Sequence, residues 1–171
     1  GAGKTTLLRL LSGLIKPDTG RIEICGRLQA LIALGAGFSP QLTGRENVYV
    51  NASILGVSKR DTDRLFDRIV DFAGIEESID MPVQSYSSGM VVRLGFSVAA
   101  HLEPDILLVD EVLSVGDLAF RTKCQVRIQE MKQKGVAIIL VSHNLHTVSH
   151  VCTRAITMDK GRIVYDGETE T

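Results

Sequence analysis

The chain begins with Gly1-Ala2-Gly3-Lys4-Thr5-Thr6, which fits the second half of the phosphate-binding pattern G-x-x-x-x-G-K-[ST]. In such a loop, glycines let backbone N–H groups close around phosphates, the lysine adds a positive charge, and the next hydroxyl can ligate Mg²⁺. Leucines follow directly at helical spacing, at positions 7, 10, 11 and 14. A helix over residues 5–14 would therefore turn the positive end of its dipole toward a bound anion.

Length and composition are typical of one soluble globular domain. The 171 residues suffice for a buried core, and the net charge is only −1. With so little charge and no tryptophan, the chain shows no sign of nucleic-acid binding. No apolar run approaches the roughly 18 residues that a membrane-spanning helix needs. The three cysteines, Cys25, Cys124 and Cys152, are far apart and fit no metal or redox pattern.

Hydrophobic periodicity divides the rest of the chain into helices and strands. It predicts helices over residues 44–55, 60–73, 89–102, 117–133 and 144–150, the first of which starts with a capping box at Thr43-Gly44-Arg45-Glu46. An aliphatic run predicts a strand buried on both faces over 105–110, and a second apolar strand is predicted over 136–141. Residues 21–25 with 28–34, and 155–158 with 163–165, are expected to form two short antiparallel elements. The order predicts an α/β fold, with a parallel sheet flanked by helices in one domain, residues 1–171.

Residues suited to catalysis follow two of the predicted strands. Asp110 and Glu111 end an aliphatic strand, where Asp110 can hold Mg²⁺ together with Thr5 and Glu111 can polarise an attacking water. His143 follows the next strand. Because parallel strands end at the same edge of a sheet, we expect these residues at the edge where ligands bind.

A second possible anion site lies at the start of the helix predicted over residues 89–102. Ser87, Ser88 and Gly89 offer N–H and hydroxyl donors at this helix N-terminus. An ordinary capped helix would use the same residue types, and for this segment alone that is the favoured interpretation. Residues 114–117, Ser-Val-Gly-Asp, form a predicted turn into the following helix.

Taken together, these motifs resemble the nucleotide-binding subunit of an ABC transporter over the whole length of the chain. Residues 1–6 match the end of the Walker A loop, and residues 86–90 stand where the family has its Leu-Ser-Gly-Gly-Gln signature. Asp110-Glu111 matches Walker B with its catalytic glutamate, residues 114–117 match the D-loop, and His143 matches the switch histidine. The resemblance implies a P-loop NTPase fold of the ABC type, with a helical subdomain over about residues 44–102 and small antiparallel β elements.

The same resemblance implies ATP and Mg²⁺ as ligands and a head-to-tail dimer with a second copy of the chain. Thr5 and Asp110 would ligate Mg²⁺, and Glu111 and His143 would be catalytic in ATP hydrolysis. A second copy would cover the bound ATP with its signature residues, Ser87, Ser88 and Gly89. The other residues implied to bind ATP are Gly1, Ala2, Gly3, Lys4, Thr5 and Thr6 of the phosphate-binding loop and Asp117 of the D-loop.

The family also implies a separate membrane permease, which would dock on the segment between residues 38 and 44. The subunit would then be peripheral, at the cytoplasmic face of the bacterial inner membrane, with no nucleic-acid partner. Because the match begins inside Walker A, we expect the chain to be a fragment that by itself binds nucleotide weakly or not at all.

Several segments depart from the general family and resemble its bacterial branch that exports lipid-linked polysaccharide, such as O-antigen, capsule or teichoic acid. These segments are residues 35–38, 42–47, 86–90 and 113–117. No glutamine stands at the matching Q-loop position; Gln29 and Gln41 flank it, and neither is assigned the role. Two alternatives remain open from the sequence: an exporter of a drug or small lipid, and a non-hydrolysing nucleotide-sensing module.

Overall fold

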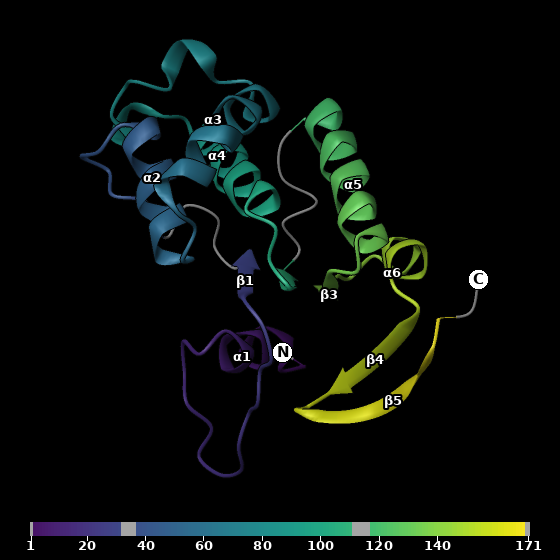
Figure 1. Ribbon diagram of the computed structural model, residues 1–171. Coiled ribbons are helices and arrows are strands. Elements are labelled where there is room, and N and C mark those ends of the chain that lie inside the picture. Colours follow the sequence, from purple (N-terminus) through teal and green to yellow (C-terminus); the bar gives the residue numbers. More distant parts are fainter. Residues whose placement is uncertain (1, 32–36, 111–116, 170–171) are drawn as a thin grey trace.

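A computed structural model describes residues 2–31, 37–110 and 117–169 of the protein (Figure 1). The described elements, in chain order, are α1 (Lys4–Leu11), β1 (Leu28–Leu31), α2 (Gly44–Ile54), α3 (Lys59–Ala73), the 3₁₀ turns η1 (Glu76–Ser78) and η2 (Val83–Ser85), α4 (Ser88–His101), β2 (Ile106–Asp110), α5 (Leu118–Gln133), β3 (Ala137–Val141), α6 (Leu145–Val151), β4 (Arg154–Asp159) and β5 (Arg162–Glu168).

The centre of the fold is a parallel sheet in the order β1-β2-β3. β2 lies in the middle, where Leu31 of β1 is in register with Val109 and Asp110 is in register with Val141 of β3. Leu107, Leu108 and Val109 are fully buried, as the unbroken aliphatic run predicts for a strand covered on both faces. Since the strands are parallel, their carboxyl ends share one edge of the sheet.

Helices cover both faces of this sheet at its middle strand, β2. Leu107 and Val109 of β2 pack in one apolar cluster with residues of α4 and α5. Side chains alternate along a strand, so Leu108 lies on the opposite face. On that face α1 contacts β2 and fully buries its Leu8.

α4 is shared by two hydrophobic clusters. Phe96 and Ala99 belong to the cluster at the sheet, whereas Leu94 and Val98 belong to a second cluster with α2 and α3. Figure 1 shows α2, α3 and α4 gathered on one side of the molecule, with α5 beside α4. α4 therefore joins the helical group to the sheet.

Two polar contacts hold α4 against its neighbours. The buried hydroxyl of Ser97 donates to the backbone carbonyl of Ile69 in α3 at 2.5 Å. On the other side, Nε and Nη2 of buried Arg127 in α5 donate to the carbonyl of Ala100 at 3.1 and 3.0 Å. Both contacts satisfy groups that would be costly to bury without partners.

The C-terminal hairpin pairs β4 with β5 in antiparallel register. Lys160 and Gly161 form its turn, and both have positive φ angles, 45° and 77°. The side chains of Arg154 and Asp166 form a bidentate ion pair across the two strands, with both N–O distances at 2.6 Å. This hairpin confirms the antiparallel element that the sequence predicts at residues 155–165.

Most predicted elements are confirmed, with ends shifted by a few residues, but one is wrong. Residues 21–25 form no strand, and Ile22 and Ile24 are exposed by 38% and 42%. β1 instead pairs in parallel with β2, where Asp105 Oδ2 accepts from the backbone N–H of Arg27 at 2.6 Å. The alternating pattern at 21–25 therefore misled the prediction, since the apolar run at 28–31 pairs with a strand far along the chain. The first helix also ends earlier than predicted, at Leu11, where Ser12 caps it.

The segment before α2 is held by Asn47, a buried polar residue with 0% exposure. Its Oδ1 accepts from the backbone N–H of Ser39 at 2.8 Å. Its Nδ2 faces the carbonyls of Ser39, Leu42 and Thr43 at 3.0, 3.2 and 3.0 Å. One amide side chain thus fixes the course of residues 39–43.

Replacing this amide should destabilise the protein. Asn47→Leu keeps the approximate size but leaves buried carbonyls and one N–H without partners, which costs about 3 kcal/mol. The matched control is Asn51→Leu on the same helix, since the side chain of Asn51 makes one hydrogen bond among the described residues, to the carbonyl of Asn47, and this substitution should cost less than about 1 kcal/mol. Urea unfolding followed by circular dichroism checks this, and equal losses in the two variants would contradict the assigned role of Asn47.

Candidate functional site

The carboxyl edge of the sheet brings the predicted catalytic strands together. Asp110 ends β2 and is partly buried, and β3 ends beside it at Val141. His143 lies just beyond β3 and is exposed, in the short connection where Asn144 caps α6. Glu111, Ser114, Val115 and Gly116 lie outside the described residues, as does Gly1. The structure thus places Asp110 and His143 at the ends of neighbouring strands, as the sequence predicts.

The phosphate-binding segment runs directly into α1. Gly3 is the N-cap of α1 with a φ of 94°, a left-handed conformation that strongly favours glycine. The first turn, Lys4-Thr5-Thr6, has no acidic side chain, and both threonines are exposed. The N–H groups of this turn therefore point toward a position where an anion is favoured.

The turn of the C-terminal hairpin supports this segment. The backbone N–H of Gly161 donates to the carbonyl of Ala2 at 3.1 Å. A Cβ at Gly3 would lie 3.4 Å from Gly161 Cα and 3.7 Å from the side chain of Met158. The β4–β5 turn therefore packs against Ala2 and Gly3, at the start of the phosphate-binding segment.

The residues that could hold Mg²⁺ have suitable chemistry. Thr5 is exposed at the start of α1, and α1 contacts β2, which ends at Asp110. A hydroxyl and a carboxylate are hard oxygen donors of the kind that Mg²⁺ takes together with water and phosphate oxygens. The donor set therefore fits a magnesium nucleotide.

The signature segment is a capped helix N-terminus. Ser87 is the N-cap of α4, and its Oγ accepts from the backbone N–H of Met90 at 3.2 Å. Ser87 and Ser88 lie at the surface end of α4, and Gly89 follows in the first turn. Capping uses the Ser87 oxygen as an acceptor, so its hydroxyl hydrogen remains able to donate to an anion.

Asp117 has a structural partner that sequence reasoning missed. It caps α5 by accepting from the backbone N–H of Phe120 at 2.8 Å, and its other oxygen pairs with Arg93 of α4. The Arg93 guanidinium also lies over the ring of Phe120, at 5.4 Å. Asp117 therefore links α5 to the signature helix. The available signal was Arg93 itself, a charge inside an otherwise apolar helix, which requires a partner.

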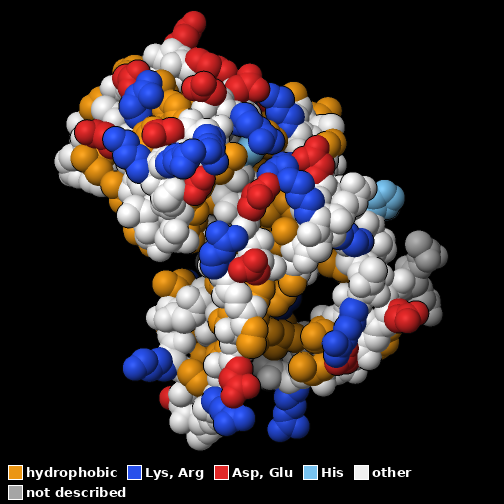
Figure 2. Space-filling view, in the orientation of Figure 1, with side chains coloured by type: hydrophobic (Ala, Val, Ile, Leu, Met, Phe, Trp, Pro, Cys, Tyr) orange, Lys and Arg blue, Asp and Glu red, His pale blue; other side chains and the backbone are white. Residues whose placement is uncertain are grey.

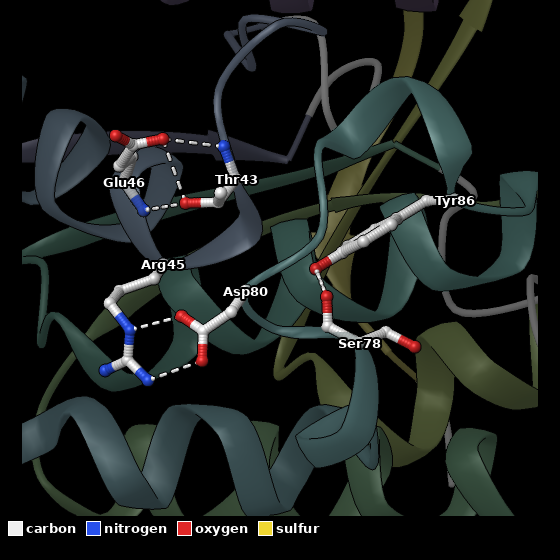
Figure 3. A network of polar contacts seen from close by, with 6 residues as sticks. All are labelled: Thr43, Arg45, Glu46, Ser78, Asp80 and Tyr86. Carbon is white, nitrogen blue, oxygen red and sulfur yellow. Dashed lines mark hydrogen bonds and ion pairs between the residues drawn. The ribbon is translucent and has the colours of Figure 1, made fainter.

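A network of polar contacts surrounds the start of α2 (Figure 3). Thr43 and Glu46 complete the predicted capping box: Thr43 Oγ1 accepts from the backbone N–H of Glu46 at 3.1 Å, and Glu46 Oε2 accepts from that of Thr43 at 2.8 Å. Arg45 forms a bidentate ion pair with Asp80, at 2.6 and 3.1 Å. Sequence reasoning predicted the box but not the ion pair, whose partners are far apart in the chain.

Backbone hydrogen bonds join the same two segments. The N–H groups of Gly44 and Arg45 donate to the carbonyls of Met81 and Ile79 at 3.2 and 2.9 Å. In the opposite direction, the N–H groups at positions 83 and 84 donate to the carbonyls at positions 42 and 40, both at 2.9 Å. Residues 40–45 and 79–84, named here the paired loops, are therefore joined along their length.

The charges of this network are favoured at neutral pH. The hydrogen bond from Arg45 lowers the pKa of Asp80, and the bonds from the backbone and hydroxyl of Thr43 lower the pKa of Glu46. Each lowered carboxyl pKa contributes stability above its unfolded-state value, and that contribution is lost as the pH falls through the folded-state pKa. Burial raises the pKa of Tyr86, so its phenol stays protonated and acts as a donor.

Neither glutamine near the expected Q-loop position lies at the sheet edge. Gln29 is within β1, in register with Leu107, two residues before the strand ends at Leu31. Gln41 lies in the first of the paired loops, where its Oε1 accepts from the hydroxyl of Ser39 at 3.1 Å. Residues 32–36, which lie between them, are outside the described residues.

The surface carries mixed charges. Figure 2 shows basic and acidic side chains interspersed over the part formed by α2, α3 and α4. A groove between α2 and α3 is lined by residues including Leu42, Arg45, Tyr49 and Val50, and the side chain of Val50 is 40% exposed. Among the residues that the structure describes, none of the helices combines the length and apolar character needed to cross a membrane.

Comparison with known proteins yields relatives named as ABC transporter or export ATP-binding proteins. A relative described as "ABC transporter protein AbcA" of Aeromonas salmonicida is 49% identical over 98% of this chain and 54% of its own length. "O-antigen export system ATP-binding protein RfbB" of Klebsiella pneumoniae is 46% identical over 99% of the chain and 69% of its length. "Teichoic acids export ATP-binding protein TagH" of Levilactobacillus brevis is 45% identical over the whole chain and 47% of its length. The chain thus spans about half to two thirds of these relatives.

Solved structures share the fold. A structure described as an ATP binding subunit of an ABC transporter superimposes with a TM-score of 0.89 at 24% identity, over 98% of this chain and 74% of its own. A dimeric post-hydrolysis state of the ATP-binding cassette MJ0796, bound to ADP and Pi, has a TM-score of 0.82 at 18% identity, over 99% of this chain and 82% of its own. The family model described as ABC transporter matches residues 1–114. The chain therefore belongs to the ABC transporter family.

Proposed function

We propose that the protein is the ATP-binding and ATP-hydrolysing subunit of an exporter that moves a lipid-linked polysaccharide through a separate permease. The observation that carries the ATPase assignment is the placement of Asp110 and His143 at the ends of neighbouring strands, with α1, which starts at the phosphate-binding turn, in contact with β2. The substrate class is supported by the relatives named for O-antigen and teichoic acid export.

Each residue at this edge has a distinct role in the proposed reaction. Lys4 and the N–H groups of the first turn of α1 bind the phosphates of ATP. Ala2 and Gly3, directly before this turn, let the backbone come close to the phosphates. Thr5 and Asp110 hold Mg²⁺, which when bound neutralises charge on the β- and γ-phosphates. Glu111 accepts a proton from the attacking water, and His143 donates a hydrogen bond toward the γ-phosphate.

The signature segment completes the site of a second copy. In the proposed head-to-tail dimer, Ser87, Ser88 and Gly89 cover the ATP that is bound to the loop of the other chain. The serines and the dipole at the start of α4 supply donors without an opposing acidic side chain in that turn. ATP binding then closes the dimer, and hydrolysis opens it.

The permease would contact the helical subdomain, which we assign to about residues 44–102. We place its docking site on the segment between residues 38 and 44 and on the adjoining groove between α2 and α3. Asn47 holds the segment in a fixed shape, and Val50 offers exposed apolar surface in the groove. The subunit would thereby be held peripherally at the cytoplasmic face of the bacterial inner membrane.

The general base can be tested directly. In the complete protein, Glu111→Gln should keep ATP binding but slow hydrolysis by roughly 10²–10⁴-fold, because the water loses its base, and it should accumulate an ATP-bound dimer. Glu103→Gln is the matched control, since Glu103 pairs with Lys134 at the opposite end of β2. Phosphate release and light scattering measure the two effects. Wild-type turnover by Glu111→Gln would refute the assignment.

Substitution of the signature serine, Ser87, should affect dimer closure rather than hydrolysis itself. Ser87→Arg should block dimer closure by bulk and charge, while each monomer still binds ATP through its own phosphate loop. Ser58→Arg is matched to it, because Ser58 also caps an exposed helix and accepts from the N–H of Asp61 at 3.2 Å. Gel filtration with ATP in the Glu111→Gln background gives the readout. If Ser87→Arg still dimerises normally, Ser87 does not face the nucleotide.

The permease surface is testable by co-purification. Val50→Asp places a charge in the groove and should reduce recovery of the permease with the tagged subunit by at least about tenfold, the effect of burying one unpaired charge. Val126→Asp on α5 makes the same change at an exposed valine outside the groove. Circular dichroism verifies that both variants are folded. Equal permease recovery with the two variants would show that the permease does not dock in this groove.

A further inference from the structure

The residue before the signature serine differs from the family's leucine, and the structure gives it a specific contact. Tyr86 is partly buried, and its hydroxyl donates to the backbone carbonyl of Ser78 at 2.6 Å (Figure 3). A leucine has no group that could make this bond. Because Tyr86 directly precedes Ser87, the phenol ties the N-cap of α4 to the connection that leads to it.

The space for this hydroxyl is made by Gly44 at the start of α2. A Cβ at position 44 would overlap the phenol oxygen of Tyr86, and it would also lie 3.0 Å from the carbonyl oxygen and 3.1 Å from Cδ1 of Ile79. Gly44 is buried in the first turn of α2, and its φ angle is not positive. Glycine is therefore required here for space rather than for its backbone conformation, at a cost in helix propensity.

This contact joins elements that are also bonded through their backbones. The paired loops carry four backbone hydrogen bonds and the Arg45–Asp80 ion pair, and they connect α2 to the signature through Tyr86. The docking segment proposed for the permease overlaps the first of these loops. These contacts therefore tie that segment to Gly44, Tyr86 and Ser87.

We propose that Tyr86 and Gly44 form a pair that positions Ser87, so that the loop before α2 and the second anion site move as one body. The proposal rests on the function proposed above. Neither residue touches ATP, so both act through Ser87. Disturbing the pair should therefore impair closure of the dimer over ATP, while the first contacts of ATP with Lys4 and Thr5 of its own chain are unaffected.

A double-mutant cycle in the complete protein tests the pair. Tyr86→Phe removes one hydrogen bond and should lower kcat for ATP roughly 3- to 10-fold. Gly44→Ala overpacks the contact and should lower kcat by more than about tenfold. The double variant should be faster than Gly44→Ala alone, because the phenol oxygen of Tyr86, the nearest of the atoms that the new methyl meets, is gone. KM for ATP should stay within about twofold in all three variants, since Lys4 and Thr5 still make the first contacts with ATP and Ser87 contacts it only at closure.

Tyr165→Phe is the matched control, because Tyr165 also donates to a backbone carbonyl, that of Glu168 at 2.9 Å, but in the hairpin of β4 and β5. It should keep wild-type kcat. A second measurement does not depend on Gly44→Ala and so remains informative if that variant folds poorly. In the Glu111→Gln background, Tyr86→Phe alone should raise the ATP concentration needed for half-maximal dimerisation about 3- to 10-fold.

The outcomes separate the positioning role of the pair from the function on which it rests. A wild-type protein without ATPase activity would overturn the proposed function. Normal ATPase in the wild type, combined with an unchanged kcat in Tyr86→Phe, would overturn only the positioning role. The positioning role would also be overturned if the kcat losses of the two single variants simply add, because independent residues show no suppression.

Discussion

The burial of α4 on two sides is the constraint on which the rest of the structure depends. One side packs against the sheet and α5 through residues such as Phe96 and Ala99, and the other against α2 and α3 through Leu94 and Val98. Side chains in both clusters are close-packed, so α4 cannot shift against either without loss of contacts. The position of Ser87 at the start of α4 is thereby fixed relative to both halves of the domain.

The fold could be predicted largely because its elements have strong local patterns. α3 buries an apolar stripe that includes Phe66, Ile69 and Val70, and β2 is an unbroken aliphatic run with a buried centre. The error at residues 21–25 has a non-local cause. Alternation is a sound indicator of a strand only where a partner exists, and the pairing of β1 with β2 depends on Arg27 and Asp105, which are distant in sequence. Local periodicity contains no information about such a pair.

The candidate site was predictable to a similar extent. The motifs at Lys4, Asp110 and His143 are short and have fixed places relative to strands, so their common edge follows from parallel topology. The supporting contacts were not predictable, because each joins residues from different elements. Arg93 with Asp117, and Tyr86 with Gly44, are examples in which neither partner is unusual until the other is placed beside it. Asn47 was missed for the same reason, since an asparagine in a helix predicts no particular burial.

The short connection from α4 to β2 has a consequence for the proposed dimer. Lys134 pairs with Glu103 at the start of this connection, and the backbone N–H of Arg27 donates to Asp105 at its end. Both ends of the connection are therefore held, so α4 and β2 have little freedom to move apart. In the head-to-tail arrangement, α4 begins at the ATP bound by the other chain, whereas β2 ends at the ATP bound by its own. Each chain would then connect the two bound nucleotides, one at the start of α4 and the other at the end of β2. By thermodynamic linkage, an effect of one ATP on the affinity for the other would be reciprocal, and the connection from α4 to β2 is a path along which each chain would transmit it.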